Sequence, residues 1–204
     1  MDDAQQPSPR PARPTRRITD VGTLKAFGHP LRMKLYGAVR VAGPATASQL
    51  AAQVDEAVSL VSYHLRKLAE HGLIEEAEAR SADARERWWQ AAQDTLSFRH
   101  EDFKDSPEGV ATHTAVVRGL IAHRNEQYET YLDQQAAWGE RWRGAADQSD
   151  FLARLNPAEL TALTAEIHAL IKTYEERGKA AEAAGDTEDR ENVAVHLAGF
   201  PFRI

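Results

Sequence analysis

The sequence predicts a mainly helical chain with one small β-hairpin, followed by a helical C-terminal region. Three observations predict this fold class. Apolar residues recur at helical spacing through most of residues 20–71 and again beyond residue 107. Two short segments, 73–79 and 85–91, instead resemble strands that enclose a polar loop. Residues typical of helix starts and helix ends separate these segments.

Bulk composition restricts the class of protein. The chain has 204 residues, of which 42% are hydrophobic, which is enough for one or two cores. It contains no cysteine, which excludes disulfides, thiolate metal sites and cysteine nucleophiles. No apolar run approaches the roughly 20 residues of a membrane span, and residues 1–17 lack the apolar core of a secretory signal. We therefore expect a cytoplasmic protein without a membrane partner.

The net charge of −6 is unevenly distributed along the chain. The balance of basic over acidic residues is +2 in residues 1–17, 0 in 18–92 and −8 in 93–204. An N-terminal domain can therefore still carry a basic face, and the overall charge neither supports nor excludes nucleic acid. Residues 1–17 combine prolines with arginines and cannot bury a core, so we expect a disordered tail there. A basic arm that touches phosphates is the alternative.

Residues 20–39 predict two helices. Val21, Leu24 and Phe27 form the apolar stripe of the first, which ends where Gly28-His29-Pro30 interrupts the pattern. His29 is interpreted as the residue that starts the second helix, in which Leu35 and its neighbours continue the stripe until Gly43-Pro44.

The next two helices are short and joined by a tight turn. Thr46 and Gln49 have the spacing of a capping box, which predicts a helix from there to about Val54. A turn at residues 55–57 leads to a helix from Val58 to His71, and Gly72 suits the left-handed residue that ends it. Its core side chains are predicted to be Leu60, Val61, Leu65 and Leu68.

The two strands follow directly on this pair of helices, as the wing does in a winged helix-turn-helix. We therefore predict such a domain over residues 18–92, and a function in binding double-stranded DNA. In this fold the second helix enters the major groove and its exposed residues contact base edges, while cations contact phosphates. The predicted DNA-binding residues are Ser48, Gln49, Ser59, Ser62, Tyr63, His64, Arg66, Lys67, Arg80, Arg85 and Arg87. For His64, a structural role between helices is the alternative.

Three segments of the predicted domain resemble one family. Residues 58–74, most specifically 61–68, resemble the recognition helix and first wing strand of the ArsR family of bacterial winged-helix repressors. Residues 27–32 resemble the family's entry to its second helix, and 85–89 resemble the second wing strand of one subgroup. The resemblance implies a homodimer, a symmetric DNA site and release by a signal. The absence of cysteine from residues 46–54 places the chain with members that lack the cysteine metal-sensing motif.

The C-terminal region, residues 93–204, is expected to be a helical dimerisation region. Ser106-Pro107-Glu108 and Asn156-Pro157 are helix starts, and the second helix carries an apolar seam suited to helix packing. A strand is expected over residues 192–204. The aromatic stretch that contains Tyr128, Tyr131, Trp138 and Trp142 is interpreted as a dimer core, or alternatively as a pocket for a small effector.

The sequence gives little support for a metal site or an enzyme active site. His113, His123 and Glu126 resemble a zinc site of some family members, but the interval between the histidines is one residue short, so we expect no metal and no cofactor. No phosphate loop or catalytic motif is present, so we expect no enzyme. A winged helix that binds proteins instead of DNA is the remaining alternative.

Overall fold

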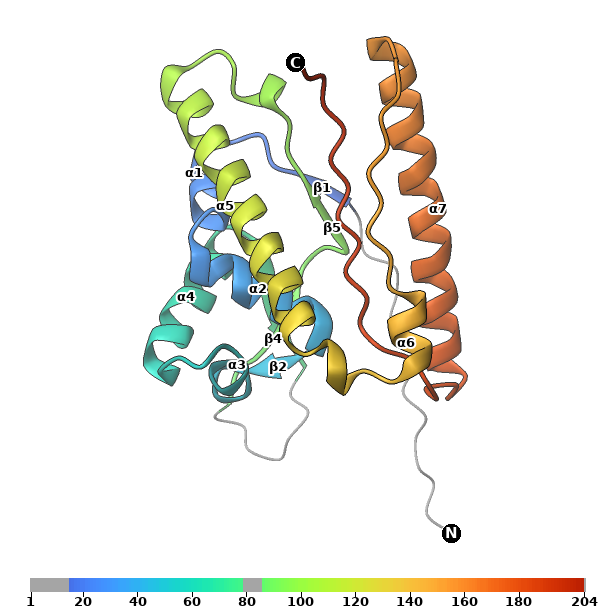
Figure 1. Cartoon of the computed structure of the whole chain (residues 1–204). Helices are drawn as coiled ribbons and strands as arrows, with labels where there is room; N and C mark the ends of the chain where they lie inside the picture. Colours follow the sequence, from blue (N-terminus) through green and yellow to red (C-terminus); the bar gives the residue numbers. More distant parts are fainter. Residues whose placement is uncertain (1–14, 79–85, 204) are drawn as a thin grey trace. The chain divides into compact units, whose positions relative to one another are not determined.

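The structure is a computed structural model, and it describes residues 15–78 and 86–203 (Figure 1). Its contacts divide the chain into two compact units. The N-terminal unit spans residues 12–137, and the second unit, here called the C-terminal unit, consists mainly of residues 138–204.

The N-terminal unit contains a helical domain with short strands. Its elements are β1 (Thr15–Arg17), α1 (Val21–Phe27), α2 (Pro30–Ala42), β2 (Ala45–Thr46), α3 (Ala47–Val54), α4 (Val58–Glu70), β3 (Ile74–Ala77), β4 (Trp88–Ala91), β5 (Thr95–Ser97), the 3-10 turn η1 (His100–Asp102), α5 (Pro107–Asp133) and the 3-10 turn η2 (Gln135–Ala137). The order of α3, α4 and the β3–β4 hairpin is that of a winged helix-turn-helix, as the sequence predicts.

Local side-chain bonds explain where these helices begin. The Asp20 carboxylate accepts the Thr23 N–H at 2.7 Å at the start of α1. His29 is the N-cap of α2 and Pro30 occupies its first turn. The predicted capping box of α3 is confirmed, because Thr46 Oγ1 accepts the Gln49 N–H at 3.3 Å and Gln49 Oε1 accepts the Thr46 N–H at 2.9 Å.

The wing is a three-stranded antiparallel sheet with the order β2-β4-β3. Ile74 pairs with Ala91 and Ala77 pairs with Trp88, which confirms the predicted hairpin. The contribution of β2, which pairs with Trp88 and Trp89 in β4, was not predicted. Residues 79–85, between β3 and β4 in the sequence, lie outside the described residues.

The expected disordered tail needs a correction at its end. Residues 15–17 form β1, which pairs in parallel with β5, and the Ile18 N–H donates to the Ser97 carbonyl at 2.8 Å. Ile18 is buried in the core, which holds this segment against the domain. Residues 1–14 lie outside the described part of the chain.

The core of the N-terminal unit lies between α1–α4, the wing and the first half of α5. Its fully buried side chains include Leu24, Leu35, Leu50, Val61, Leu65, Leu68 and Leu73. The helix α5 packs against α1 and α2 (Figure 1). Gly28 permits this approach, since an added Cβ would lie 2.4 Å from Cγ2 of Val116.

One predicted core position of α4 is wrong. Leu60 is exposed, and the buried face consists of Val61, His64, Leu65 and Leu68. These four residues follow the i, i+3, i+4, i+7 spacing of one helix face, whereas Leu60 lies beside that face.

The C-terminal unit consists of two helices and long connecting segments. The helices are α6 (Glu140–Ala145) and α7 (Pro157–Ala183). Asn156 and Glu159 form the capping box that starts α7. Residues 192–203, where the sequence predicts a strand, have no regular secondary structure. Within the described ranges, no helix combines the length and apolarity that a membrane crossing requires.

Candidate nucleic-acid interface

The exposed side of α4 is a polar stripe. Ser59, Ser62, Tyr63 and Arg66 follow the same i, i+3, i+4, i+7 spacing as the buried face, but on the opposite side of the helix. Tyr63 leaves 47% of its surface exposed, while Leu65 in the same turn is fully buried. The core therefore fixes the rotation of α4 and directs this stripe outward.

The N-terminus of α4 presents free backbone donors. Its N-cap is Ala57, which has no side-chain oxygen, and no described side chain replaces it. The first intrahelical bond runs from the Val61 N–H to the Ala57 carbonyl at 3.0 Å. The preceding N–H groups, of Val58, Ser59 and Leu60, therefore lack helical acceptors, and such groups favour an anion.

The two cations of α4, Arg66 and Lys67, differ in their hydrogen-bond partners. Arg66 reaches back along the helix, and its Nε donates to the Ser62 carbonyl at 3.2 Å. Lys67 Nζ lies 2.7 Å from Glu70 Oε2, and this hydrogen bond raises the pKa of Lys67 and lowers that of Glu70. A phosphate near Lys67 would therefore have to compete with Glu70, whereas no carboxylate pairs with Arg66 among the described residues.

His64 is placed away from the exposed stripe, which corrects its predicted position at base edges. Only 6% of its surface is exposed, and its ring lies 4.5 Å from that of His29. Arg32 Nη1 is 3.5 Å from His64 Nδ1. Burial is the largest cause that lowers the pKa of His64, and the charges of His29 and Arg32 lower it further. The ring connects α4 to the start of α2.

The predicted residues of α3 lie at its exposed start. Ser48 and Gln49 are both exposed. Because Gln49 Oε1 is used by the capping box, only the amide N–H₂ of its side chain remains as a donor for an outside group.

The predicted wing cations are only partly within the described residues. Arg80 and Arg85 lie outside them, and Arg87 is exposed just before β4. The strand β3 carries Glu75, whose carboxylate accepts a bond from Gln90 Nε2 at 3.0 Å.

Sequence reasoning missed three residues near the stripe. Val58 and Leu60 are exposed apolar side chains at the start of α4, of the kind that contact thymine methyl groups. Arg32 is half-buried beside His64 and donates to the carbonyls of Ala26 and Lys25. The periodicity of α4 read from Val61 rather than Leu60 would have identified Leu60, but not Val58, which lies three residues before Val61 at the spacing of the buried face.

The C-terminal end of α4 is held by the N-terminal strand. Arg16 Nη1 donates to the carbonyls of His71 and Gly72 at 2.8 and 2.7 Å. Gln93 Nε2 donates to the same Gly72 carbonyl at 2.7 Å. A cation at this end of a helix interacts favourably with its dipole.

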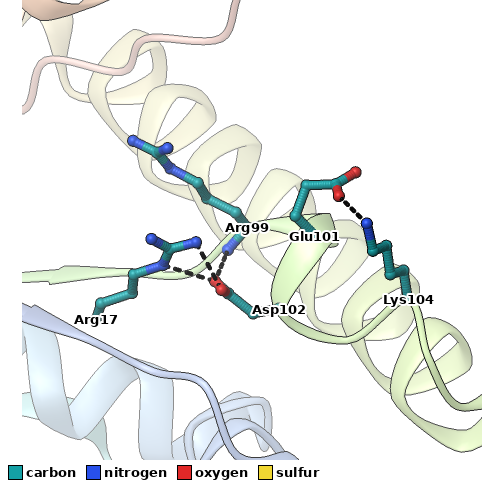
Figure 2. A network of polar contacts seen from close by, with 5 residues as sticks. All are labelled: Arg17, Arg99, Glu101, Asp102 and Lys104. Carbon is teal, nitrogen blue, oxygen red and sulfur yellow. Dashed lines mark hydrogen bonds and ion pairs between the residues drawn. The ribbon is translucent and has the colours of Figure 1, made fainter.

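The next residue of that strand, Arg17, anchors it to η1. Figure 2 shows the Arg17 guanidinium donating twice to Asp102, at 2.9 and 2.6 Å, while the Arg99 N–H donates to the same carboxylate at 3.1 Å. The Arg17 bond is the largest cause that lowers the pKa of Asp102. Two successive arginines thus connect β1 to the end of α4 and to η1.

The histidines considered for zinc lie in separate surroundings. His113 packs against the rings of Phe98, His100 and Phe103. His123 Nδ1 lies 3.9 Å from Glu126 Oε2. Within the described part of the chain, no three His, Asp or Glu side chains are grouped in a way that could hold a metal ion.

The aromatic stretch forms two local pairs. Tyr128 and Tyr131 stack with ring centroids 6.0 Å apart on α5, and Trp138 and Trp142 meet edge to face at 6.4 Å in the C-terminal unit.

Comparison with known proteins supports the helix-turn-helix. Residues 27–77 match the model of a helix-turn-helix domain. A solved structure of a ZitR mutant from Lactococcus lactis in its apo form is 16% identical and matches over 74% of this chain and 81% of that chain, with a TM-score of 0.27. A score this low supports no argument about fold or function. No curated protein sequence matches the chain.

Proposed function

We propose that the chain is a sequence-specific DNA-binding transcriptional regulator that acts as a homodimeric repressor. The observation that carries the proposal is the polar stripe of Ser59, Ser62, Tyr63 and Arg66, held outward by the buried face of α4 within a winged helix-turn-helix. The match of residues 27–77 to a helix-turn-helix domain supports a regulator rather than an enzyme. The repressor role rests on the resemblance of residues 58–74 to the ArsR family.

We assign the recognition of the DNA sequence to exposed residues near the start of α4. Hydroxyls of Ser59, Ser62 and Tyr63 can donate to and accept from base edges in a major groove. Val58 and Leu60 add apolar surface beside them, which suits a thymine methyl. His64 is left out of this set because its ring is buried against His29.

We assign the contacts with DNA phosphates to backbone donors and cations around the polar stripe. The free N–H groups at the start of α4 and the exposed side chains of Ser48 and Gln49 can donate to phosphate oxygens. Arg66, Lys67 and the wing arginines Arg80, Arg85 and Arg87 supply charge. The region 18–92 is neutral overall, so the affinity must come from this local arrangement and must fall with salt.

The dimer is proposed from exposed apolar side chains on the long helices. On α5, Ile121, Tyr128 and Leu132 are exposed along one stripe, and on α7 the exposed stripe is Leu163, Leu170 and Tyr174. Exposed apolar rows of this length are typical of helix pairing. A twofold dimer would place two α4 helices about 34 Å apart, one DNA turn, and read an inverted repeat.

Selection from random duplexes, followed by binding measured at several salt concentrations, tests the function. Wild-type chain is expected to enrich one inverted-repeat sequence. Arg66→Ala with Lys67→Ala should weaken binding to all sequences alike and reduce the salt slope by about 2. Ser62→Ala with Tyr63→Phe should instead lower the preference for the selected sequence over random DNA.

Lys104→Ala is the matched control. Lys104 pairs with Glu101 at 2.7 Å (Figure 2), with the same i, i+3 spacing as Lys67 and Glu70, but it lies after η1 and not on α4. It should leave the affinity unchanged. Wild-type chain that binds no duplex, or binds it without salt dependence, would contradict the proposal and favour a protein-binding winged helix.

A further inference from the structure

A cavity lies between α2, α3 and α5, away from the polar stripe of α4. Its volume is about 410 Å³, and it is more open to solvent than enclosed. One face of α2 forms its floor with Gly37, Ala38 and Val41, and Val54 at the end of α3 continues this apolar surface. Lys34, Gln53, Asp55, His123 and Gln127 complete the lining.

Gly37 is not explained by the packing of the chain itself. It lies inside α2, where glycine is among the least favourable residues. A Cβ added there would meet no atom within 4 Å, so no described neighbour needs the room. Gly28 in the same region is different, because Val116 fills the space beside it. The room at Gly37 is therefore available to a molecule from outside.

The charged groups around the cavity leave one carboxylate uncompensated. Lys34 Nζ is paired with Glu126 Oε1 at 2.7 Å. Burial lowers the pKa of His123, so this ring adds no positive charge at neutral pH. The backbone N–H of Asp55, in the turn between α3 and α4, donates to the Ala51 carbonyl, but its exposed carboxylate makes no hydrogen bond or ion pair with another described residue. The carboxamides of Gln53 and Gln127 add acceptors at the rim.

We propose that this cavity binds a small organic monocation with an apolar body and N–H donors. The apolar body lies on Gly37, Ala38 and Val41, and the cationic N–H groups face Asp55 and the two carboxamides. An anion is disfavoured, because the one cation of the lining already has a carboxylate partner.

The site would also regulate DNA binding, a consequence that rests on the proposed function. Asp55 is the C-cap of α3 and directly precedes the turn into α4. A ligand that connects Asp55 to α2 and α5 would restrain that turn, and thus the relative position of α3 and α4. The affinity of the ligand for the chain must then change when DNA is bound. It changes by the same factor by which the ligand changes the affinity of the chain for DNA.

Nuclear magnetic resonance of the full ¹⁵N-labelled chain tests the binding itself, without DNA. Benzamidine is the probe, and benzoate is its anionic counterpart of similar shape. Benzamidine should produce saturable shifts at Ala38, Val41, Val54 and Gln127, with a Kd of about 1 mM as expected of so small a ligand. Benzoate should produce none at these residues. Asp55→Asn should weaken benzamidine binding about tenfold.

Gly37→Leu is the decisive variant, and Gly37→Ala is its control. Both replace glycine by a better helix former, so both should raise the melting temperature, but only leucine fills the cavity. Gly37→Leu should abolish the shifts and Gly37→Ala should retain most of them. Equal shifts with benzoate, no saturable shifts, or shifts that survive Gly37→Leu would overturn the proposal. Loss of a dimer in Gly37→Leu would overturn it too, because a partner helix would then occupy the space.

The two proposals fail separately. If benzamidine does not bind while wild-type chain still enriches a DNA sequence, only the ligand site is refuted. If benzamidine binds but no duplex does, the site remains and the regulatory role of the chain is refuted.

Discussion

The two units of this chain differ in what their apolar side chains do. In the N-terminal unit, Leu24, Leu65 and Leu68 are fully buried. In the C-terminal unit, none of the described residues from 138 to 203 is buried, although Phe151, Leu152 and Phe200 are among them and are largely exposed. Yet both units form well-capped helices, with a complete capping box at the start of α3 and of α7.

This difference separates helix formation from core formation. Local features, such as the caps and the i, i+4 pair between Lys172 and Glu176, are sufficient to specify α7. They do not bury its apolar side chains, and burial supplies most of the stability of helices in proteins. The C-terminal unit therefore forms its helices without forming a buried core of its own.

The largest contrast is expected between two leucine-to-alanine substitutions. Leu65→Ala in α4 should lower the free energy of unfolding by about 2–5 kcal/mol, because it leaves a cavity in the core. Leu170→Ala in α7, where the leucine is 60% exposed, should change it by less than about 0.5 kcal/mol in the monomer. Urea unfolding at low protein concentration measures both. A large effect of Leu170→Ala in the monomer would show that α7 is packed within one chain.

The next effect concerns the proposed dimer. Leu170→Asp with Tyr174→Asp should convert a dimer to a monomer in analytical ultracentrifugation, since it places charge on the exposed stripe of α7. Affinity for an inverted repeat should then fall about 100-fold, because the second half-site is no longer held close. An unchanged dimer would place the interface elsewhere.

A smaller effect is expected at the end of α4. Arg16→Ala should destabilise the N-terminal unit by about 1–2 kcal/mol, because it removes a charged donor from the carbonyls of His71 and Gly72. Hydrogen exchange should show the loss in α4 peptides and not in α7. Arg17→Ala, which breaks an ion pair with Asp102 in which the Arg17 side chain is about half exposed, is the control and should cost less. If both variants lose the same stability, Arg16 stabilises the unit only by holding β1 in place.

The smallest effect we expect is a pH dependence confined to the N-terminal unit. Burial lowers the pKa of His29, His64, His113 and His123. The unfolded chain, with a histidine pKa of about 6.5, then binds more protons than the folded one just below that pH. Stability should be complete above about pH 6.5 and decrease as the pH falls through the lower folded values. Hydrogen exchange at pH-corrected rates should show faster opening of α4 in acid; unchanged opening would contradict it.

Elements specified by local residues could be predicted from the sequence. The break at Gly28–Pro30, the caps at Thr46 and Asn156 and the wing hairpin all depend on neighbours in the chain. Much of the candidate site follows, because an exposed stripe is the complement of a buried one. The assignment of Leu60 to the core was wrong, and for His64 the sequence left a DNA contact and a structural role between helices open, since its packing depends on a partner such as His29, which pattern reasoning does not supply.

Non-local elements could not be predicted. Each of β1 and β5 has three residues, and their pairing joins positions about 80 residues apart, so neither carries a recognisable local pattern. The cavity beside Gly37 likewise depends on how α2, α3 and α5 meet, and a single glycine in a helix does not reveal it.

The pairing of β1 with β5 has a consequence for the order of folding. The ribosome releases Arg16 before any part of the domain, but its place beside β5 exists only after Thr95–Ser97 has been made. By then α4 has been synthesised, so β1, which is made before α4, reaches its final pairing only after it. Nascent chains that stop before residue 95 should therefore contain both α4 and Arg16 but lack the β1–β5 pairing that positions Arg16 at the final turn of α4.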